Sequence, residues 1–296
     1  MSPTSAPTEP TSTGSRLPAA ARLGPVELIV TDLDRTLDFY SRVIGLHSHR
    51  REGAIAAMTS GGENVLIFHE QPEARRAGSH AGLFHVALLY PTRLELSRVA
   101  RRVASSGSPV TGASDHGTHE AIYLSDPDGN GLELAADRPR EQWPDVSDPA
   151  AYAAGPQPLD TQDLLRLTQG EQAPERADGV AVGHVHLHVA DAAAALRFYR
   201  DVVGFDEMVS LLPSAAFVSA GGYHHHVAFN VWRGSGLPPA PPDAVGMRRF
   251  TLVLPGAADV AELRRRVVDA GLELESAQGG TLLRDPSGNA LLVRAE

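Results

Sequence analysis

The chain contains an internal repeat. The segment DLDRTLDFYSRVIGL at residues 32–46 returns as DAAAALRFYRDVVGF at residues 191–205, and both copies share Leu-x-Phe-Tyr followed by Val-x-Gly. A second pair, DPDGNGLEL at 126–134 and DPSGNALLV at 285–293, is separated by the same distance along the chain. Because a fixed period is the mark of a repeated structural unit, we expect two copies of one fold.

Each half of the chain divides again into two units with the same predicted order of elements. The first unit opens with the alternating strand PVELIVTDL, followed by a helix with apolar residues at helical spacing and then by short strands separated by glycines. The turn DPDGN closes a hairpin by ordinary turn chemistry. We therefore predict an α+β fold with the pattern βαβββ in four units, numbered one to four, at about residues 22–70, 81–137, 181–233 and 246–295.

Composition also predicts the domain boundaries. Residues 1–20 are rich in Pro, Ser and Thr and are expected to form a disordered tail. Residues 138–178 are rich in Pro, Asp, Gln and Ala, which is typical of a linker, with one short helical stretch near LDTQDLLRL. A first domain at residues 21–137 and a second domain at 179–296 are therefore predicted.

Charge and residue usage exclude several kinds of protein. The formal net charge of −10 argues against nucleic acid or an anionic membrane surface as partner, because both require a basic face. The chain has no cysteine, which excludes disulfides, thiolate zinc sites and a cysteine nucleophile. No apolar run approaches the ~20 residues of a membrane span, and the N-terminus lacks the pattern of a signal peptide. A cytoplasmic location is the default expectation.

Histidine clusters are the first indication of chemistry. The chain has thirteen histidines, with GHVHLHV at residues 183–189 and YHHH at 223–226. Clustered neutral imidazoles indicate metal binding or acid–base chemistry. In a regular strand His184, His186 and His188 share one face, so all three are expected to point the same way.

Four βαβββ units, with His in an opening strand and Glu two residues after a GNG turn, resemble the vicinal oxygen chelate superfamily of glyoxalases, bleomycin resistance proteins and extradiol dioxygenases. Within it the sequence is similar to two-domain catechol 2,3-dioxygenases, over nearly the whole chain apart from the first 20 residues and the linker. The resemblance implies two half-closed barrels, each made by a pair of units. In the metal-binding pair, one unit gives a His ligand and an acid–base His, and the other gives a His and a Glu ligand.

The resemblance assigns roles to individual residues. In unit three, GHVHLHV supplies His184 as a metal ligand, and YHHHVAF supplies His225 as the acid–base residue. In unit two, LFHVAL supplies His85 and the closing strand supplies Glu133 as ligands. Tyr123, in EAIYLSDP, matches a tyrosine that hydrogen-bonds the bound substrate.

The sequence departs from the family pattern in where the ligands occur. Unit four has Arg249 at the position of His85 and Leu292 at the position of Glu133, and unit one has Pro25 at the position of His184. A complete ligand set is obtained only by joining unit two to unit three. We therefore predict that these two units pair across the middle of the chain, which leaves units one and four to form a metal-free barrel.

The resemblance implies extradiol cleavage of a small aromatic diol by O₂. Two imidazoles and one carboxylate on one face of an octahedral metal, Fe(II) or alternatively Mn(II), leave three positions for the diol and O₂. His225 would act first as base and then as acid. Tyr123, His186 and His116 would orient the ring. A homo-oligomer is compatible with the sequence, and no nucleic acid or membrane partner is expected.

Strand parity gives further expectations. Phe84 and Val86 are expected on the apolar face opposite His85. His116 is expected on the face of Tyr123, with His119 on the other face and exposed to solvent. His224 and His226 are expected on the strand face opposite His225, although the sequence leaves open which of the three is the acid–base residue.

Two other functions remain open at this point. One is a glyoxalase-type isomerase using Ni(II) or Zn(II), and the other is a metal-free binding protein of the resistance type. The second alternative predicts that the three ligands do not converge. The sequence does not distinguish a catechol from a hydroquinone, or Fe(II) from Mn(II).

Overall fold

The computed structural model describes four ranges of the chain, residues 16–76, 78–144, 155–172 and 176–296. Residues 1–15 of the predicted tail and parts of the predicted linker lie outside these ranges. Leu17 is buried, and its backbone N–H donates to the carbonyl of Gly204 at 2.8 Å. The domain boundaries drawn from composition stay a prediction.

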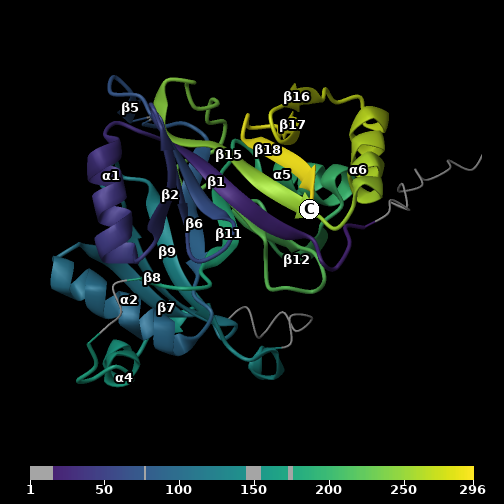
Figure 1. Cartoon of the computed structure of the whole chain (residues 1–296). Coiled ribbons are helices and arrows are strands. Elements are labelled where there is room, and N and C mark those ends of the chain that lie inside the picture. The colour runs from purple at the N-terminus through teal and green to yellow at the C-terminus, as the bar shows by residue number, and fades with distance from the viewer. Residues whose placement is uncertain (1–15, 77, 145–154, 173–175) are drawn as a thin grey trace, which may run out of the picture.

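Two nine-stranded sheets form the body of the molecule, and each combines one unit from either half of the chain (Figure 1). In the first sheet, β1 (Arg22–Val30) of unit one pairs antiparallel with β15 (Ala244–Leu254) of unit four. In the second sheet, β6 (Gly82–Leu89) of unit two pairs antiparallel with β11 (Ala181–His188) of unit three. The predicted pairing of units two and three is therefore confirmed, and neither sheet closes on itself.

The other strands complete both sheets symmetrically. Those of the first sheet are β2 (His47–Glu52), β3 (Ile55–Thr59), β4 (Asn64–Glu70), β5 (Arg75–Arg76), β16 (Glu275–Ala277), β17 (Gly280–Arg284) and β18 (Ala290–Ala295). Its order is β16-β17-β18-β15-β1-β4-β3-β2, with β5 beside β15. Those of the second sheet are β7 (Val110–Asp115), β8 (His119–Ser125), β9 (Gly131–Asp137), β10 (Gln157–Pro158), β12 (Asp206–Leu211), β13 (Ala215–Ser219) and β14 (Val227–Asn230). Its order is β10-β7-β8-β9-β6-β11-β14-β13-β12.

The repeated helices begin and end in the same way. Asp32 caps α1 (Leu33–Phe39) and Asp191 caps α5 (Ala192–Arg197), because the Asp32 carboxylate accepts from one backbone N–H of the first turn and the Asp191 carboxylate from two. Both continue into a π-helical turn that ends at a glycine with positive φ, Gly45 at 92° and Gly204 at 101°. The remaining helical segments among the described residues are α2 (Arg93–Ser106), η2 (Arg140–Gln142), α4 (Thr161–Arg166) and α6 (Ala257–Asp269). The helix α4 falls where LDTQDLLRL predicted one. Within the described ranges no helix is long and apolar enough to cross a membrane.

The two repeated sequence motifs contact each other. The hydroxyl of Tyr40, from the first Phe-Tyr motif, donates to Asp126 of the DPDGN turn at 3.2 Å. In the second half, Tyr199 donates to Asp285 of the DPSGN turn at 3.1 Å. Each bond joins one unit to the next within the same half, so it ties one sheet to the other. The equal spacing of the motifs therefore reflects a repeated tertiary contact.

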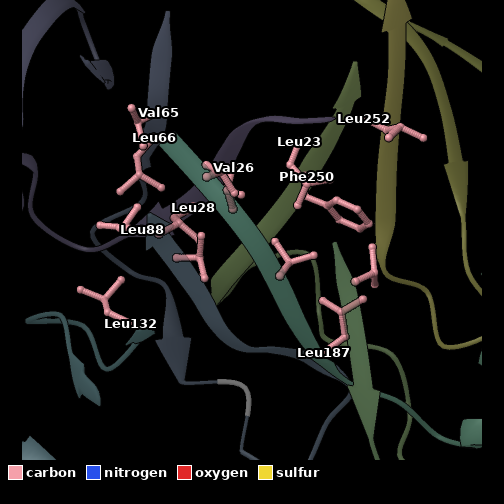
Figure 2. Close-up of a cluster of buried hydrophobic side chains, with 14 of the residues drawn as sticks. Leu23, Val26, Leu28, Val65, Leu66, Leu88, Leu132, Leu187, Phe250 and Leu252 are labelled. Carbon is pink, nitrogen blue, oxygen red and sulfur yellow. The ribbon is translucent and has the colours of Figure 1, made fainter. Parts of the chain in front are cut away.

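One continuous apolar core lies between the two sheets. Figure 2 shows side chains of β1, β4 and β15 from the first sheet packed with side chains of β6, β9 and β11 from the second. On β11, Val185 and Leu187 belong to this core. Because strand side chains alternate, the histidines of the same strand are directed to the opposite face of the second sheet. The shared core therefore positions a row of imidazoles on the face of the second sheet opposite the core.

Candidate metal centre

His85, Glu133 and His184 converge from three adjacent strands, β6, β9 and β11. Glu133 Oε2 lies 3.0 Å from His85 Nε2 and 3.2 Å from His184 Nε2. The two imidazole nitrogens are 3.3 Å apart. All three residues are buried, and their ligand atoms form one of the groups able to hold a metal. The convergence that a metal-free binding protein would lack is therefore present.

The geometry of this trio fits a divalent metal. Bonds of about 2.1 Å that meet near a right angle place adjacent donor atoms about 3.0 Å apart. The three observed separations, 3.0, 3.2 and 3.3 Å, form such a triangle. Two neutral nitrogens and one carboxylate oxygen also suit Fe(II), Mn(II) and related ions. The residues present could therefore hold one metal on a single face.

The electrostatics of Glu133 favour an ionised ligand. Burial by itself would raise the pKa of this carboxyl. The facing imidazoles of His184, His119 and His85 outweigh that effect and hold the pKa of Glu133 well below its usual range. Burial lowers the pKa of His184. A neutral imidazole and a carboxylate are the forms that bind metal.

A β-bulge at Phe84 shapes the centre, and it contradicts the expected parity of this strand. His186 pairs with His85, but Leu187 pairs with Leu83, so Phe84 is an extra residue in the ladder. Val86 lies in the core as expected. The ring of Phe84, in contrast, lies 4.9 Å from His85 and 5.0 Å from His186. Phe84 therefore contacts the histidines instead of packing on the opposite face.

The bulge explains why a glycine follows the DPDGN turn. A Cβ built on Gly131 would lie 2.0 Å from the carbonyl oxygen of Phe84, so an alanine fits there only if the backbone moves. Gly131→Ala is expected to push β9 away from β6, separate Glu133 from His85 and weaken Mn(II) binding at least about tenfold. Equilibrium dialysis measures the effect.

A matched control for Gly131 exists in unit four, which has Ala290 at the equivalent position. Ala290→Gly should leave Mn(II) binding unchanged and lower the free energy of unfolding by only about 0.5–1 kcal/mol. Wild-type Mn(II) affinity in folded Gly131→Ala would contradict the steric account.

His119 was expected to face solvent, and that expectation is wrong. His119 is 2% exposed, and its Nε2 lies 3.0 Å from Glu133 Oε1. It is four residues from Tyr123 in the regular strand β8, and an even spacing puts both side chains on one face. The other ring nitrogen contacts the hydroxyl of Thr118 at 2.9 Å. His119 therefore holds the second carboxylate oxygen of Glu133, as outer partners of metal ligands commonly do.

His116 and Tyr123 lie beside His119, although His116 precedes β8. The ring of His116 stacks on His119 with centroids 4.4 Å apart, and its Nε2 lies 2.7 Å from the Tyr123 hydroxyl. Burial, followed by the charge of Glu133, raises the pKa of Tyr123 above its ordinary value. Burial and the neighbouring His119 lower the pKa of His116 to about 4. The phenol therefore stays protonated, and the imidazole stays neutral.

The YHHH segment does not follow strand parity, because β14 begins only at Val227. His225 lies against His184, with ring centroids 4.1 Å apart. His224 was expected on the opposite face, but it turns to the same side and stacks on His119 at 4.5 Å. His226 does turn away, and its Nδ1 contacts the hydroxyl of Ser219 at 2.9 Å. His224 and His225 both border the centre because this part of the chain is irregular.

Aromatic side chains that the sequence did not single out stand beside His186. The indole of Trp232 lies 5.2 Å from His186 and 5.4 Å from Phe84, and it is exposed. Phe217 lies 5.9 Å from His186 and 5.2 Å from His225. Parity along β13 could have indicated Phe217, whereas the bulge at Phe84 leaves no simple sequence signal.

Asn230 fixes the proton positions of two histidines. Its side-chain N–H donates to His186 Nε2 at 2.8 Å, and its carbonyl oxygen lies 2.9 Å from His188 Nδ1. His186 thus carries its proton on Nδ1, and His188 donates from Nδ1. Both imidazoles are buried, as the predicted common face requires.

The first sheet has an ion pair where the second sheet has the paired histidines His85 and His186. In register, Glu27 pairs with Arg249 as His186 pairs with His85. The carboxylate of Glu27 lies 2.6 Å from Arg249 Nε and 2.7 Å from His69 Nε2. Leu292, at the position of Glu133, is buried in a small apolar cluster. Among the described residues, every group suited to a metal is formed by residues of units two and three.

Comparison with known proteins gives one family and several relatives. The family model described as the Glyoxalase/Bleomycin resistance protein/Dioxygenase superfamily matches residues 22–134 and 181–293. A relative from Bacillus subtilis (strain 168), named catechol-2,3-dioxygenase, is 38% identical over 275 residues, 92% of this chain and 96% of its own.

Solved structures agree on the fold. A protein from Bacillus subtilis subsp. subtilis str. 168 superposes with a TM-score of 0.68 at 12% identity, covering 95% of this chain and 86% of that one. Glyoxalase I from Zea mays superposes with a TM-score of 0.58 at 15% identity, covering 93% and 92%.

Proposed function

Because the chain belongs to the glyoxalase, bleomycin resistance protein and dioxygenase superfamily, we propose that it is an extradiol dioxygenase, which opens a catechol-type ring with both atoms of O₂. The observation that carries the proposal is the single-faced trio of His85, Glu133 and His184. The 38% identity of the chain to a relative named catechol-2,3-dioxygenase supports the same reaction. We propose Fe(II) as the metal, with Mn(II) as the ion that shares this ligand set.

The ligand set leaves room for the reactants. A metal held on one face by His85, Glu133 and His184 would keep positions open for the two diol oxygens and for O₂. The bound metal would supply Lewis acidity to the diol and a path for electrons from the ring to oxygen. Glu133 contributes one negative charge, which leaves net positive charge to attract a diol monoanion. This balance favours an anionic chelating substrate.

The surrounding side chains divide the remaining work. His225, neutral and beside His184, would take the proton of the diol hydroxyl and return it later in the reaction. Burial, followed by the neighbouring His184, holds the pKa of His225 well below its usual range, so it starts as a base. Tyr123 would donate a hydrogen bond to substrate oxygen. Phe84 and Trp232 would contact the ring, while His186 and His116 orient it.

Oxygen uptake tests the proposal directly. Protein loaded anaerobically with Fe(II) should consume one O₂ per catechol and yield a yellow ring-opened product, measured with an oxygen electrode and by absorbance. His225→Gln should keep bound Fe(II) and lower kcat about 100-fold or more, because general acid–base catalysis contributes about 10²–10⁴. Absence of O₂ uptake across a panel of catechols and hydroquinones, with Fe(II) bound, would refute the function. Parallel loading with Mn(II) identifies the active metal.

A further inference from the structure

We infer that Asp137 and His224 hold His225 in the single tautomer that carries its proton on Nδ1 and leaves Nε2 free. His225 would then present an unprotonated nitrogen to the reactants, and Asp137 and His224 would be positioning residues. The catalytic importance of this arrangement rests on the proposed function, but the tautomer itself does not.

A chain of contacts leads from Asp137 to His225. Asp137 ends β9, and its Oδ1 lies 3.2 Å from His224 Nε2. The Nδ1 of His224 lies 2.9 Å from the Nδ1 of His225. The hydroxyl of Tyr223 donates to the same Oδ1 of Asp137 at 3.2 Å. Carboxylate, first imidazole and second imidazole are thus connected in one line.

Hydrogen-bond chemistry fixes each proton along this line. A carboxylate only accepts, so His224 must donate to Asp137 from Nε2. A neutral His224 then has a lone pair on Nδ1, and the 2.9 Å contact requires His225 to donate from its own Nδ1. A neutral His225 therefore has its free lone pair on Nε2. Within the described ranges that nitrogen makes no protein hydrogen bond.

Packing keeps His224 in place. Its side chain is 2% exposed and lies between two rings, Tyr223 at 4.0 Å and His119 at 4.5 Å. Trp143 contacts the same ring at 5.3 Å. The stacking of His224 on nearly parallel His119, 16° apart, also argues against both rings binding one metal, because a metal cannot lie in both ring planes. A hydrogen-bonding role therefore suits His224 better than joint ligation of a metal with His119.

Nitrogen NMR of the Zn(II)-loaded protein tests the inference without turnover, since Zn(II) is diamagnetic. Long-range ¹H–¹⁵N spectra should show His225 protonated at Nδ1 only and His224 protonated at Nε2 only. A His225 protonated at Nε2 in the unaltered protein would overturn the inference.

Variants test the two positioning residues. His224→Phe keeps an aromatic ring but removes the acceptor, so His225 should become a mixture of tautomers, with kcat about tenfold lower and KM nearly unchanged. Asp137→Ala should act in the same direction. Asp137→Asn should behave like the wild type, because its amide oxygen can still accept from Tyr223 and His224. His226→Gln, next in sequence but outside the line, is the control and should leave the His225 spectrum unchanged.

The results separate this inference from the proposed function. The expected tautomer without any O₂ uptake would refute the dioxygenase and retain the positioning role. Normal turnover and an unchanged His225 spectrum in both His224→Phe and Asp137→Ala would refute the positioning role and leave the dioxygenase intact.

Discussion

Glu133→Gln is expected to bind Fe(II) or Mn(II) at least about 100-fold more weakly than the wild type and to lose O₂ uptake with it. The substitution keeps the shape of the side chain but removes the only negative charge in the trio with His85 and His184. Loss of an outer partner already weakens metal binding about 10–100-fold, so loss of a charged ligand should exceed that. Equilibrium dialysis against Mn(II), followed by metal analysis, measures the change.

Two further variants make this experiment specific. Glu27→Gln alters a buried carboxylate in the first sheet, next to Arg249, and should leave the Mn(II) affinity at its wild-type value. His119→Phe removes the group that holds Glu133 Oε1 and should have an intermediate effect, about 10–100-fold. Wild-type Mn(II) affinity in Glu133→Gln would show that the trio is not the metal centre.

The pairing of the units could be predicted from the absence of metal ligands at positions where the repeat would place them. Arg249 and Leu292 occupy positions where unit two has its ligands, so the repeat itself implied that units two and three must meet. The structure pairs β6 with β11 accordingly. Such reasoning succeeds because metal ligation requires several side chains to meet at one point. Motifs that can be read locally in the sequence therefore constrain which units lie together in the fold.

The finer features of the site depend on breaks in regularity. Counting alternate residues works only inside an unbroken strand, so the bulge at Phe84 and the irregular segment before Val227 reversed the expected directions of Phe84 and His224. Asp137 was not singled out because an Asp at the end of a strand is ordinary. Its importance arises from Tyr223 and His224, which approach it from the other half of the chain.

The ion pair of the first sheet should make a large contribution to stability that depends on pH. Arg249→Met leaves the buried carboxylate of Glu27 facing His69, with half-exposed Arg248 4.0 Å away. Removing one partner of a buried pair costs about 3–5 kcal/mol, because the other charge remains desolvated. Urea unfolding at pH 7, in the presence of a chelator that removes any metal contribution, should show this loss.

The sign of the pH dependence follows from the pKa of Glu27. Burial alone would raise that pKa, but hydrogen bonds from His69 and Arg249 outweigh it and lower the pKa below its ordinary value of 4.5. The carboxylate therefore stabilises the wild type above about pH 4.5, and this stabilisation is lost as the pH falls through the lowered pKa. In Arg249→Met the burial of Glu27 dominates and raises its pKa. Protonation of Glu27 at low pH then reduces the destabilisation of the variant. The difference in unfolding free energy between wild type and variant should be largest at pH 7 and smaller near pH 4.

A double variant distinguishes charge from packing as the cause of this loss. Glu27→Met combined with Arg249→Met removes both charges, and apolar replacement of a buried pair is often neutral or stabilising by about 1–4 kcal/mol. The double variant should therefore recover most of the free energy of unfolding at pH 7. Its stability should also not decrease in acid through protonation of Glu27, as that of the wild type does. If it is as unstable as Arg249→Met alone, the arginine acts through the packing of its side chain. Recovery would mean that the ion pair, whose Arg249 occupies the position of the ligand His85, is not required for the fold.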